Sequence, residues 1–285
     1  VCTDDSSLVS LGMLPSGYEF VLNRLAVEAD YLITLGVVSP HYFAGYSGGR
    51  KSILPGICGK KTVQDNHARM VEILDHMPPN PISLEMIDAA RKVGVNFVFN
   101  AVMNADNQVV RLVAGDLVEA WYEAVDTSSS MYEIPFTEPV DIAVSSACGY
   151  PRDVNWYQAQ KAIDHADKIV KPGGTIIVCG ECRDGYGNKV FEEWMKKKLP
   201  PEEVMREIRA HFVLGGHKAF AFAKVASEKK LVLVSSMNAE DTATLYGTKA
   251  ASVQEAFDQA VAACPDASIA IMPEGGLTLP VHMNA

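Results

Sequence analysis

The chain has 285 residues, of which 48% are hydrophobic and 21% charged, and its formal net charge at pH 7 is -10. This length suffices for two domains, and the composition is that of a globular protein with a sizeable core. The acidic balance excludes a nucleic-acid-binding surface of clustered positive charge, although a few local Lys or Arg residues still allow a small anion to bind. No run of about 18 apolar residues occurs, so we expect no membrane-spanning segment.

The six cysteines are scattered along the chain. A disulfide framework is typical of shorter, secreted, Cys-rich proteins, so we predict a reduced, cytoplasmic protein. The first residues lack the basic start and apolar core of a signal peptide. The chain opens with Val1 inside a loop-like stretch, as is expected of a fragment or a processed chain.

Short apolar runs alternate with longer amphipathic runs in the first part of the chain, which is the pattern of α/β architecture. A buried strand is predicted over residues 31–35, and it leads into a loop near Ser39-Pro40. Helical patterns follow over residues 60–75 and 83–92. Strands are predicted over residues 95–103 and 108–113, and a further helix over residues 116–126.

Residues 128–139 mix Ser, Pro and Thr without periodicity, and we place a domain boundary there. Beyond it the alternation continues, with strands at 140–145, 174–178, 231–235 and 268–272 and helices at 156–166, 201–211, 218–226 and 253–263. A turn is predicted at residues 171–173. This spacing predicts a mostly parallel sheet with helices on both faces. Ligands of such sheets bind beyond the carboxyl ends of the strands, so we expect function in the loops after Ser145, Val178 and Met272.

The densest local signal is a glycine-rich stretch, HYFAGYSGGRKS, which runs from His41 to Ser52. Three glycines and a serine bring backbone N–H groups together ahead of Arg50 and Lys51, a composition that suits a phosphate or another anion. An exposed tight turn explains the composition equally well. The stretch is not a Walker A loop, because Arg50 stands where that motif needs a glycine before the lysine. We therefore reject an ordinary P-loop NTPase and keep phosphoryl transfer only as a third hypothesis.

Sixteen residues after Lys51, His67 lies in a helical pattern. A helical histidine is most often a capping or surface group, but a second histidine, His41, stands at the start of the glycine-rich stretch. Neutral imidazole binds nickel, zinc or copper, and it exchanges protons near pH 7. No H-E-x-x-H or paired C-x-x-C zinc pattern accompanies these residues, so the protein supplies few metal ligands unless a cofactor supplies the rest.

This combined pattern resembles the signature stretch of the nickel-pincer-nucleotide-dependent lactate racemase family, and the likeness extends over nearly all 285 residues. The matching positions are His41, Ala44-Gly45, Ser47-Gly48-Gly49, Lys51, Pro55-Gly56 and Asn66-His67. The resemblance implies that Lys51 carries the nickel-pincer nucleotide (pyridinium-3-thioamide-5-thiocarboxylic acid mononucleotide) covalently. It also implies that His67 completes the coordination of nickel and that His41 is the general base on the substrate hydroxyl. Ser47, Gly48 and Gly49 are the expected cofactor contacts in the loop.

Such a cofactor suits the chemistry of a 2-hydroxy acid. Removal of the Cα proton is hard because the neighbouring carboxylate destabilises a carbanion, whereas removal of hydride leaves a flat 2-keto acid that accepts hydride on either face. A histidine takes the hydroxyl proton as hydride leaves and returns it later. The cofactor performs the electronic step, and the protein orients the substrate and supplies protons. We therefore predict an isomerase, a racemase or epimerase of lactate or a related 2-hydroxy acid.

A second motif, Cys148 to Lys161, follows a predicted strand and leads into a predicted helix. Tyr157 and Lys161 are four residues apart and share a helix face, so both could reach one anion, although a surface Tyr–Lys pair has the same spacing. The family resemblance places Tyr157, Gln158 and Lys161 beside the cofactor and the substrate.

The other motifs give weaker indications of a functional site. Cys179-Gly180-Glu181-Cys182 follows a strand as a thioredoxin-like redox motif does, but its flanking sequence and the chain size do not match that class. Gly215-Gly216-His217-Lys218 at a helix start could bind an anion, but helix capping explains it better. We interpret the remaining histidines as structural: His76, His165, His211 and His282.

The resemblance implies two α/β domains with mostly parallel sheets and a cofactor site in the cleft between them. Residues 1–130 are expected to be part of an N-terminal cofactor-binding domain, and residues 131–285 a Rossmann-like C-terminal domain. Family members are longer at the N-terminus, where an Asp-x-x-Arg-Pro stretch and a second catalytic histidine occur. This chain has no Arg-Pro dipeptide and no histidine before His41. We therefore expect it to be catalytically incomplete by itself.

The expected partners are a small 2-hydroxy acid, the enzymes that make the cofactor, and the N-terminal segment of the family. The alternative to a racemase is a cofactor-binding fragment or a degenerate homologue that binds a nucleotide without turnover.

Overall fold

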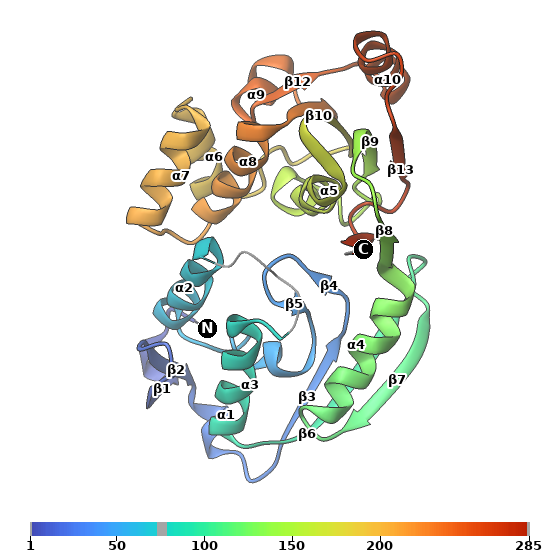
Figure 1. The fold of residues 1–285 in the computed structure, drawn as a ribbon. Coiled ribbons are helices and arrows are strands. Elements are labelled where there is room, and N and C mark those ends of the chain that lie inside the picture. The colour runs from blue at the N-terminus through green and yellow to red at the C-terminus, as the bar shows by residue number, and fades with distance from the viewer. Residues whose placement is uncertain (1, 73–78, 284–285) are drawn as a thin grey trace. The chain divides into compact units, whose positions relative to one another are not determined.

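The computed structural model describes residues 2–72 and 79–283, and the chain divides into two compact units, of which the first ends at Tyr132 and the second begins at Glu133. The elements of both are labelled in Figure 1. Each unit combines helices with sheets, and most strands of the larger sheets run parallel. The expectation of an α/β protein with mostly parallel sheets is confirmed.

The first unit is built on a three-stranded sheet with one helix on its inner face. The strand order is β3 (Leu32–Val37), β6 (Val95–Met103) and β7 (Val109–Gly115), with β3 parallel to β6 and β6 antiparallel to β7. The helix α4 (Glu119–Tyr132) packs against β6 and β7 and contributes Trp121 and Ala124 to the core. The unit begins with η1 (Asp5–Ser7), the antiparallel pair β1 (Leu8–Met13) and β2 (Glu19–Asn23), and α1 (Arg24–Glu28).

The glycine-rich stretch of the first unit forms a short hairpin followed by a 3-10 turn. The hairpin pairs β4 (Pro40–His41) with β5 (Gly45–Tyr46), and the turn is η2 (Gly49–Ser52). Three further helical segments follow: α2 (Lys60–Ala68), η3 (Arg69–Glu72) and α3 (Pro81–Val93). The helix α3 begins with the side chain of Asn80 accepting from the Ser83 N–H and ends at Gly94 in the left-handed region, so both of its ends are capped.

The second unit contains a five-stranded parallel sheet in the order β12 (Gly247–Lys249), β11 (Lys230–Val234), β10 (Val170–Cys179), β9 (Val140–Ser146) and β13 (Ile269–Met272). Alternate residues of β9 point to opposite faces. Ile142 packs with Ala256 of α10 (Val253–Ala263), whereas the Ser145 hydroxyl donates to the Ala162 carbonyl of α5 (Trp156–Ile169). The sheet therefore has helices on both faces, as the alternation predicted.

The remaining elements of the second unit surround this sheet. The helix α8 (Gly216–Glu228) packs beside α5 and contacts α6 (Lys189–Lys196) and α7 (Pro201–Ala210). The short helix α9 (Ala239–Thr244) contacts β12, and β8 (Glu133–Phe136) pairs in parallel with β14 (Leu279–His282).

Several sequence-based boundaries differ from the structure. The helix α4 continues through residues 128–132, inside the aperiodic stretch in which we placed a domain boundary, because Ser128 and Tyr132 are buried on its inner side. The predicted turn at residues 171–173 lies within β10, at an irregularity in its register with β9. The helix predicted over residues 60–75 ends at Ala68 and continues as η3, and its last positions lie outside the described residues.

Among the helices of residues 2–72 and 79–283, none has the length and the apolar character that crossing a membrane requires.

Candidate functional site

Three side chains predicted to act in catalysis lie around one aromatic ring in the first unit, that of Phe43. Phe43 is buried in the turn between β4 and β5. The Lys51 Nζ lies 5.4 Å from the centroid of its ring, and the ring centroids of His67 and His41 lie 4.9 Å and 4.6 Å from that centroid. An amine and two imidazoles from η2, α2 and β4 are therefore gathered around Phe43, and we refer to these four residues as the Phe43 cluster.

His67 is oriented by a backbone hydrogen bond. Its Nδ1 lies 2.8 Å from the Val63 carbonyl oxygen, one helical turn earlier in α2. A carbonyl oxygen only accepts, so Nδ1 carries the proton, and the lone pair of the neutral ring lies on Nε2. Metal-binding histidines are commonly fixed in this way, with one N–H on a backbone carbonyl and the other nitrogen on the metal. His67 is therefore oriented as such ligands are, and its role as a metal ligand stays a prediction.

His41 has the opposite tautomer preference. Its Nδ1 accepts a long hydrogen bond of 3.4 Å from the Ala44 N–H, which favours the neutral ring with its proton on Nε2. The ring also stacks on Tyr42, with centroids 5.1 Å apart. In this state Nδ1 is the basic nitrogen of His41.

Arg50 holds the loop around the Phe43 cluster in place. Its side chain is fully buried, and its guanidinium donates to the carbonyl oxygens of Tyr46 and Ala44 and to the Ser83 hydroxyl, each at 2.9 Å. The guanidinium carbon lies 3.5 Å from the Trp121 ring centroid. Burial lowers the pKa of Arg50 to about 9. Arg50 therefore serves the fold, and the expectation that it offers a point charge to an anion is wrong.

The glycines of the loop are required by close packing. Gly48 has a φ of 74°, and a Cβ there would lie 2.6 Å from Val38 Cγ2. Gly49 has a φ of 48°, and a Cβ there would lie 3.0 Å from Trp121 Cδ1. Any L-residue at either position would be strained and crowded.

The polar groups of this loop bond within the first unit. The Ser47 hydroxyl donates to the Val37 carbonyl at 2.7 Å, and the Gly49 N–H donates to Asn100 Oδ1 at 3.0 Å. The N–H groups of Tyr46, Ser47 and Lys51 donate to backbone carbonyls. These N–H groups therefore do not form the anion cradle that the composition suggested. A contact of Ser47, Gly48 or Gly49 with a cofactor stays a prediction.

A second cluster of polar side chains lies between α5 and α8 in the second unit. The His217 Nδ1 accepts from the Gly215 N–H at 3.1 Å, which leaves the proton on Nε2, and this nitrogen lies 3.4 Å from the Tyr157 hydroxyl. The Lys218 Nζ donates to Gln160 Oε1 at 2.9 Å and lies 5.2 Å from the Tyr157 ring centroid. We call Tyr157, Gln160, Lys161, His217 and Lys218 the α5–α8 cluster.

The α5–α8 cluster crowds positive charge. Burial, followed by the charge of Lys161, lowers the pKa of Lys218 to about 7, while Asp164 acts in the opposite direction. Burial, followed by the charge of Arg152, lowers the pKa of Lys161. An anion beside Lys161 would offset both effects.

Sequence reasoning placed some residues of this cluster and missed others. Tyr157 and Lys161 share one face of α5, as their spacing predicted. The structure leaves Gln158 exposed and outside the cluster, whereas Gln160 is buried and bonded to Lys218. His217 and Lys218 were interpreted as helix capping. The two glycines before them were the available signal, because they let the start of α8 pack closely against Asn188, Val190 and Trp194.

The other motifs do not form a reactive site. Cys179 and Cys182 are free cysteines, and burial raises the pKa of both thiols, which disfavours the reactive thiolate. His165 is buried with its Nδ1 2.8 Å from the Gly275 carbonyl oxygen, and burial lowers its pKa. His211 and His282 are exposed, and His76 lies outside the described residues. No group of three His, Cys, Asp or Glu side chains able to hold a metal ion occurs in residues 2–72 and 79–283.

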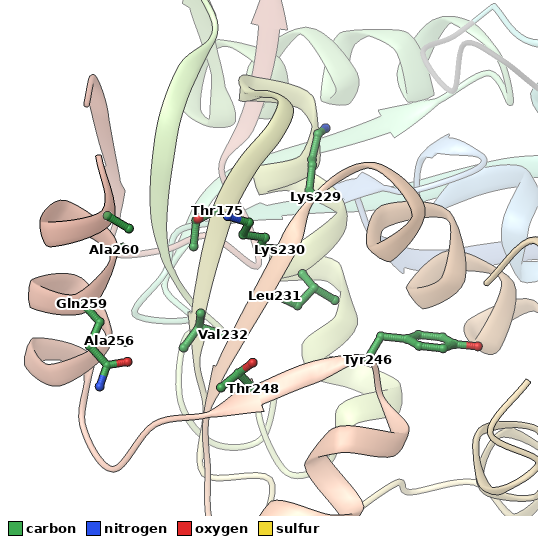
Figure 2. Close-up of a pocket in the computed structure, with 11 residues that line it drawn as sticks. Thr175, Lys229, Lys230, Leu231, Val232, Tyr246, Thr248, Ala256, Gln259 and Ala260 are labelled. Atoms are coloured by element: carbon green, nitrogen blue, oxygen red, sulfur yellow. The ribbon is translucent and has the colours of Figure 1, made fainter. Parts of the chain in front are cut away.

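A cavity of about 440 Å³ lies elsewhere in the second unit. Figure 2 shows it between α10, which contributes Ala256, Gln259 and Ala260, and the sheet, which contributes Leu231 and Thr248. Lys229 at its rim is paired with Asp167. The cavity includes none of the residues of either cluster, so it is not part of the candidate site.

The two-unit α/β fold is shared with known proteins. Residues 1–77 match the family model for the lactate racemase N-terminal domain, and residues 136–279 match that for the lactate racemase C-terminal domain. The chain belongs to the lactate racemase family.

Individual relatives agree with this assignment. The chain is 34% identical over 278 residues to the lactate racemase of Thermoanaerobacterium thermosaccharolyticum, which covers 93% of the chain and 65% of that protein. It is 34% identical over 288 residues to the lactate racemase of Lactiplantibacillus plantarum, which covers 96% of the chain and 67% of that protein. The chain thus spans about two thirds of the length of these relatives.

Solved structures extend the comparison. The apoprotein structure of the Thermoanaerobacterium thermosaccharolyticum lactate racemase superposes with a TM-score of 0.94 at 32% identity, over 99% of this chain and 70% of that chain. A Thermotoga maritima protein at 18% identity superposes with a TM-score of 0.75, over 98% of this chain and 76% of that chain. The second likeness shows a shared fold.

Replacing the buried arginine tests its structural role. We expect Arg50→Met to lower the free energy of unfolding by about 2–4 kcal/mol, because it leaves the Ala44 and Tyr46 carbonyl oxygens buried without their donors. Urea unfolding measures the change. The matched control is Arg111→Met in the same unit, where an exposed ion pair with Glu123 is lost at a cost below about 1 kcal/mol. Equal losses in the two variants would contradict this role.

The buried lysine of α8 predicts a specific pH dependence of stability. Native Lys218 releases its proton near pH 7, whereas the unfolded chain holds it to about pH 10.4, so the unfolded state binds more protons between these values. Stability should therefore rise with pH in this window, by up to about 1.4 kcal/mol per pH unit. Urea unfolding of Lys218→Met should lack this contribution, while Lys224→Met on the exposed side of α8 should keep it. Parallel profiles for wild type and Lys218→Met would refute the assignment.

Proposed function

We propose that this chain binds a nickel-pincer nucleotide through Lys51 and His67 and that it serves the interconversion of the two enantiomers of a 2-hydroxy acid such as lactate. The observation that carries the proposal is the position of the Lys51 amine and the His67 imidazole against the same Phe43 ring. The two relatives named lactate racemases support the reaction class.

The residues present fit such a group. A primary amine is the functional group that a thioamide link requires, and Lys51 lies in η2 with its side chain half-buried. Imidazole is a preferred ligand of nickel, and the neutral His67 ring has its lone pair on Nε2. When bound, the nucleotide supplies the hydride acceptor and donor for the substrate Cα, which is the electronic step that amino acid side chains cannot perform.

His41 is the proposed acid and base. An imidazole exchanges protons near pH 7, so the His41 ring is suited to accept the proton of the substrate hydroxyl. His41 would return that proton when the keto group is reduced. The Phe43 ring packs against His41 in a T-shaped contact, with centroids 4.6 Å apart, and so limits water on that side of His41.

The α5–α8 cluster is the proposed anion site. Lys161, crowded by Arg152 and Lys218, favours a carboxylate of the substrate or a phosphate of the cofactor, and the Tyr157 hydroxyl adds a hydrogen bond. Gln158 stays a predicted contact. The Rossmann-like assignment of residues 131–285 rests on the strand order, in which β9 lies between β10 and the late strand β13.

A cofactor shared by residues 1–130 and by the C-terminal residues is part of this proposal. The cofactor-making enzymes as partners and a cytoplasmic location are further parts of it.

A second candidate function is cofactor binding without turnover. It needs only the Lys51 amine and the His67 imidazole, which lie against the same Phe43 ring. Chiral chromatography of L-lactate incubated with the cofactor-loaded chain separates the two candidates. Appearance of D-lactate supports racemisation. Loaded protein that leaves L-lactate, and a panel of other chiral 2-hydroxy acids, unchanged supports binding alone.

The covalent link is tested at Lys51. We expect intact-protein mass spectrometry, after co-expression with the cofactor-making enzymes, to show the added mass of the nucleotide on wild type and its loss in Lys51→Arg. Arginine keeps the positive charge of the side chain but removes the primary amine that a thioamide needs. An unmodified wild-type chain would refute the proposal.

The matched control is Lys60→Arg, which changes an exposed lysine at the start of α2 in the same unit. This variant should carry the full added mass. If Lys51→Arg carries it too, the attachment site is wrong while the family assignment is unaffected.

A further inference from the structure

A buried carboxylate, that of Glu85 in α3, joins three segments of the first unit. The residue is 3% exposed. Its Oε1 accepts from the Ser16 N–H at 3.0 Å and from the Ser16 hydroxyl, in the turn between β1 and β2. Its Oε2 accepts from the Tyr18 hydroxyl at 2.6 Å and from the Arg69 guanidinium at 2.7 Å. A buried charge needs such donors, and here they come from the β1–β2 turn and from η3.

Residues on both sides of His67 are tied to Glu85. Arg69 is the C-cap of α2 and stands two residues after His67. Asn66 stands directly before His67 and is fully buried, and its Nδ2 donates to the Tyr18 hydroxyl oxygen at 3.4 Å. The Tyr18 hydroxyl gives its own proton to Glu85, so its oxygen is able to accept from Asn66. His67 is therefore held by Arg69 directly and by Asn66 through Tyr18.

The helix α3 also holds the glycine-rich loop. At its start, the Asn80 Nδ2 donates to the Phe43 carbonyl oxygen at 3.3 Å, and the Ser83 hydroxyl accepts from the Arg50 guanidinium at 2.9 Å. Glu85 stands two residues after Ser83 in the same helix. Because the hydrogen-bonded backbone of a helix keeps such neighbours at a fixed spacing, α3 links the loop that carries Lys51 to the end of α2.

Two different contacts set the geometry of His67. The bond between its Nδ1 and the Val63 carbonyl oxygen lies within α2, so it fixes the ring relative to its own helix. The bonds of Glu85 instead fix the end of that helix relative to the Phe43 ring, whose centroid lies 4.9 Å from that of His67. We propose that Glu85 is a positioning residue that holds His67 where it can bind nickel. The inference rests on the proposed function, in which His67 is the nickel ligand.

Glu85→Gln tests the proposal, because an amide keeps the volume of the side chain but offers a single acceptor oxygen to the donors that now share a carboxylate. In the cofactor-loaded protein, we expect the nickel affinity, measured by competition with a chelator, to fall about tenfold or more, as it does when the outer-shell partners of a metal ligand are lost. In the cofactor-free chain, we expect weaker nuclear Overhauser effects between the ring protons of His67 and Phe43, because the two rings move apart.

Tyr18→Phe is the milder variant. It removes one hydroxyl and keeps the aromatic ring, and it should change both measurements in the same direction. Should Glu85→Gln fail to fold by circular dichroism, Tyr18→Phe decides. The matched control is Asp167→Asn, which also turns the carboxylate of an ion pair into an amide, but in the second unit, where Asp167 pairs with Lys229. This control should leave both measurements unchanged.

Wild-type nickel affinity and wild-type Overhauser effects in folded Glu85→Gln and Tyr18→Phe would overturn the proposal. Equal changes in Asp167→Asn would also overturn it, because they would show a general loss of stability. The measurement on the cofactor-free chain separates this inference from the proposed function. If wild type holds nickel without an imidazole, the proposed function fails, while the Overhauser comparison still shows whether Glu85 places His67 against Phe43.

Discussion

The geometry of the Phe43 cluster depends on one buried cation, the guanidinium of Arg50. The Arg50 guanidinium bonds to the carbonyl oxygens of the β4–β5 hairpin and lies on Trp121, which in turn donates from its indole N–H to the Ser47 carbonyl oxygen at 2.9 Å. Adjacent residues of a 3-10 turn point about 120° apart, so an inward Arg50 directs Lys51 to another side. That side is the Phe43 ring, where the two histidines also lie.

The two units differ in how they bury positive charge. Arg50 keeps a satisfied guanidinium because backbone carbonyl oxygens surround it, and it is unavailable to a ligand. Burial and the charge of Arg152 lower the pKa of Lys161, and burial and the charge of Lys161 lower the pKa of Lys218. Burial disfavours the charged form of both lysines, and a bound anion would offset this effect. This contrast gives Arg50 a structural role, and it supports the proposal that an anion binds beside Lys161 and Lys218.

Sequence patterns predicted the elements better than the contacts. The strand β6 and the helix α10 match their predictions at both ends, because long periodic runs reveal which face is buried. Periodicity does not reveal a partner, so Arg50 next to Lys51 was interpreted as a second anion-binding charge. The same limit applies to Gln160 and Lys218, whose contact joins two helices far apart in sequence. The glycines were noticed for their N–H groups, whereas the structure uses their lack of a side chain.

In the proposed site, the lone pair of His67 and the amine of Lys51 hold one nickel-bearing group. Nickel X-ray absorption on the cofactor-loaded protein examines this, with His67→Gln compared with His211→Gln, which alters an exposed histidine. We expect one imidazole in the nickel coordination shell of wild type and His211→Gln, and its loss in His67→Gln. A nickel spectrum of His67→Gln that matches wild type would refute the role of His67.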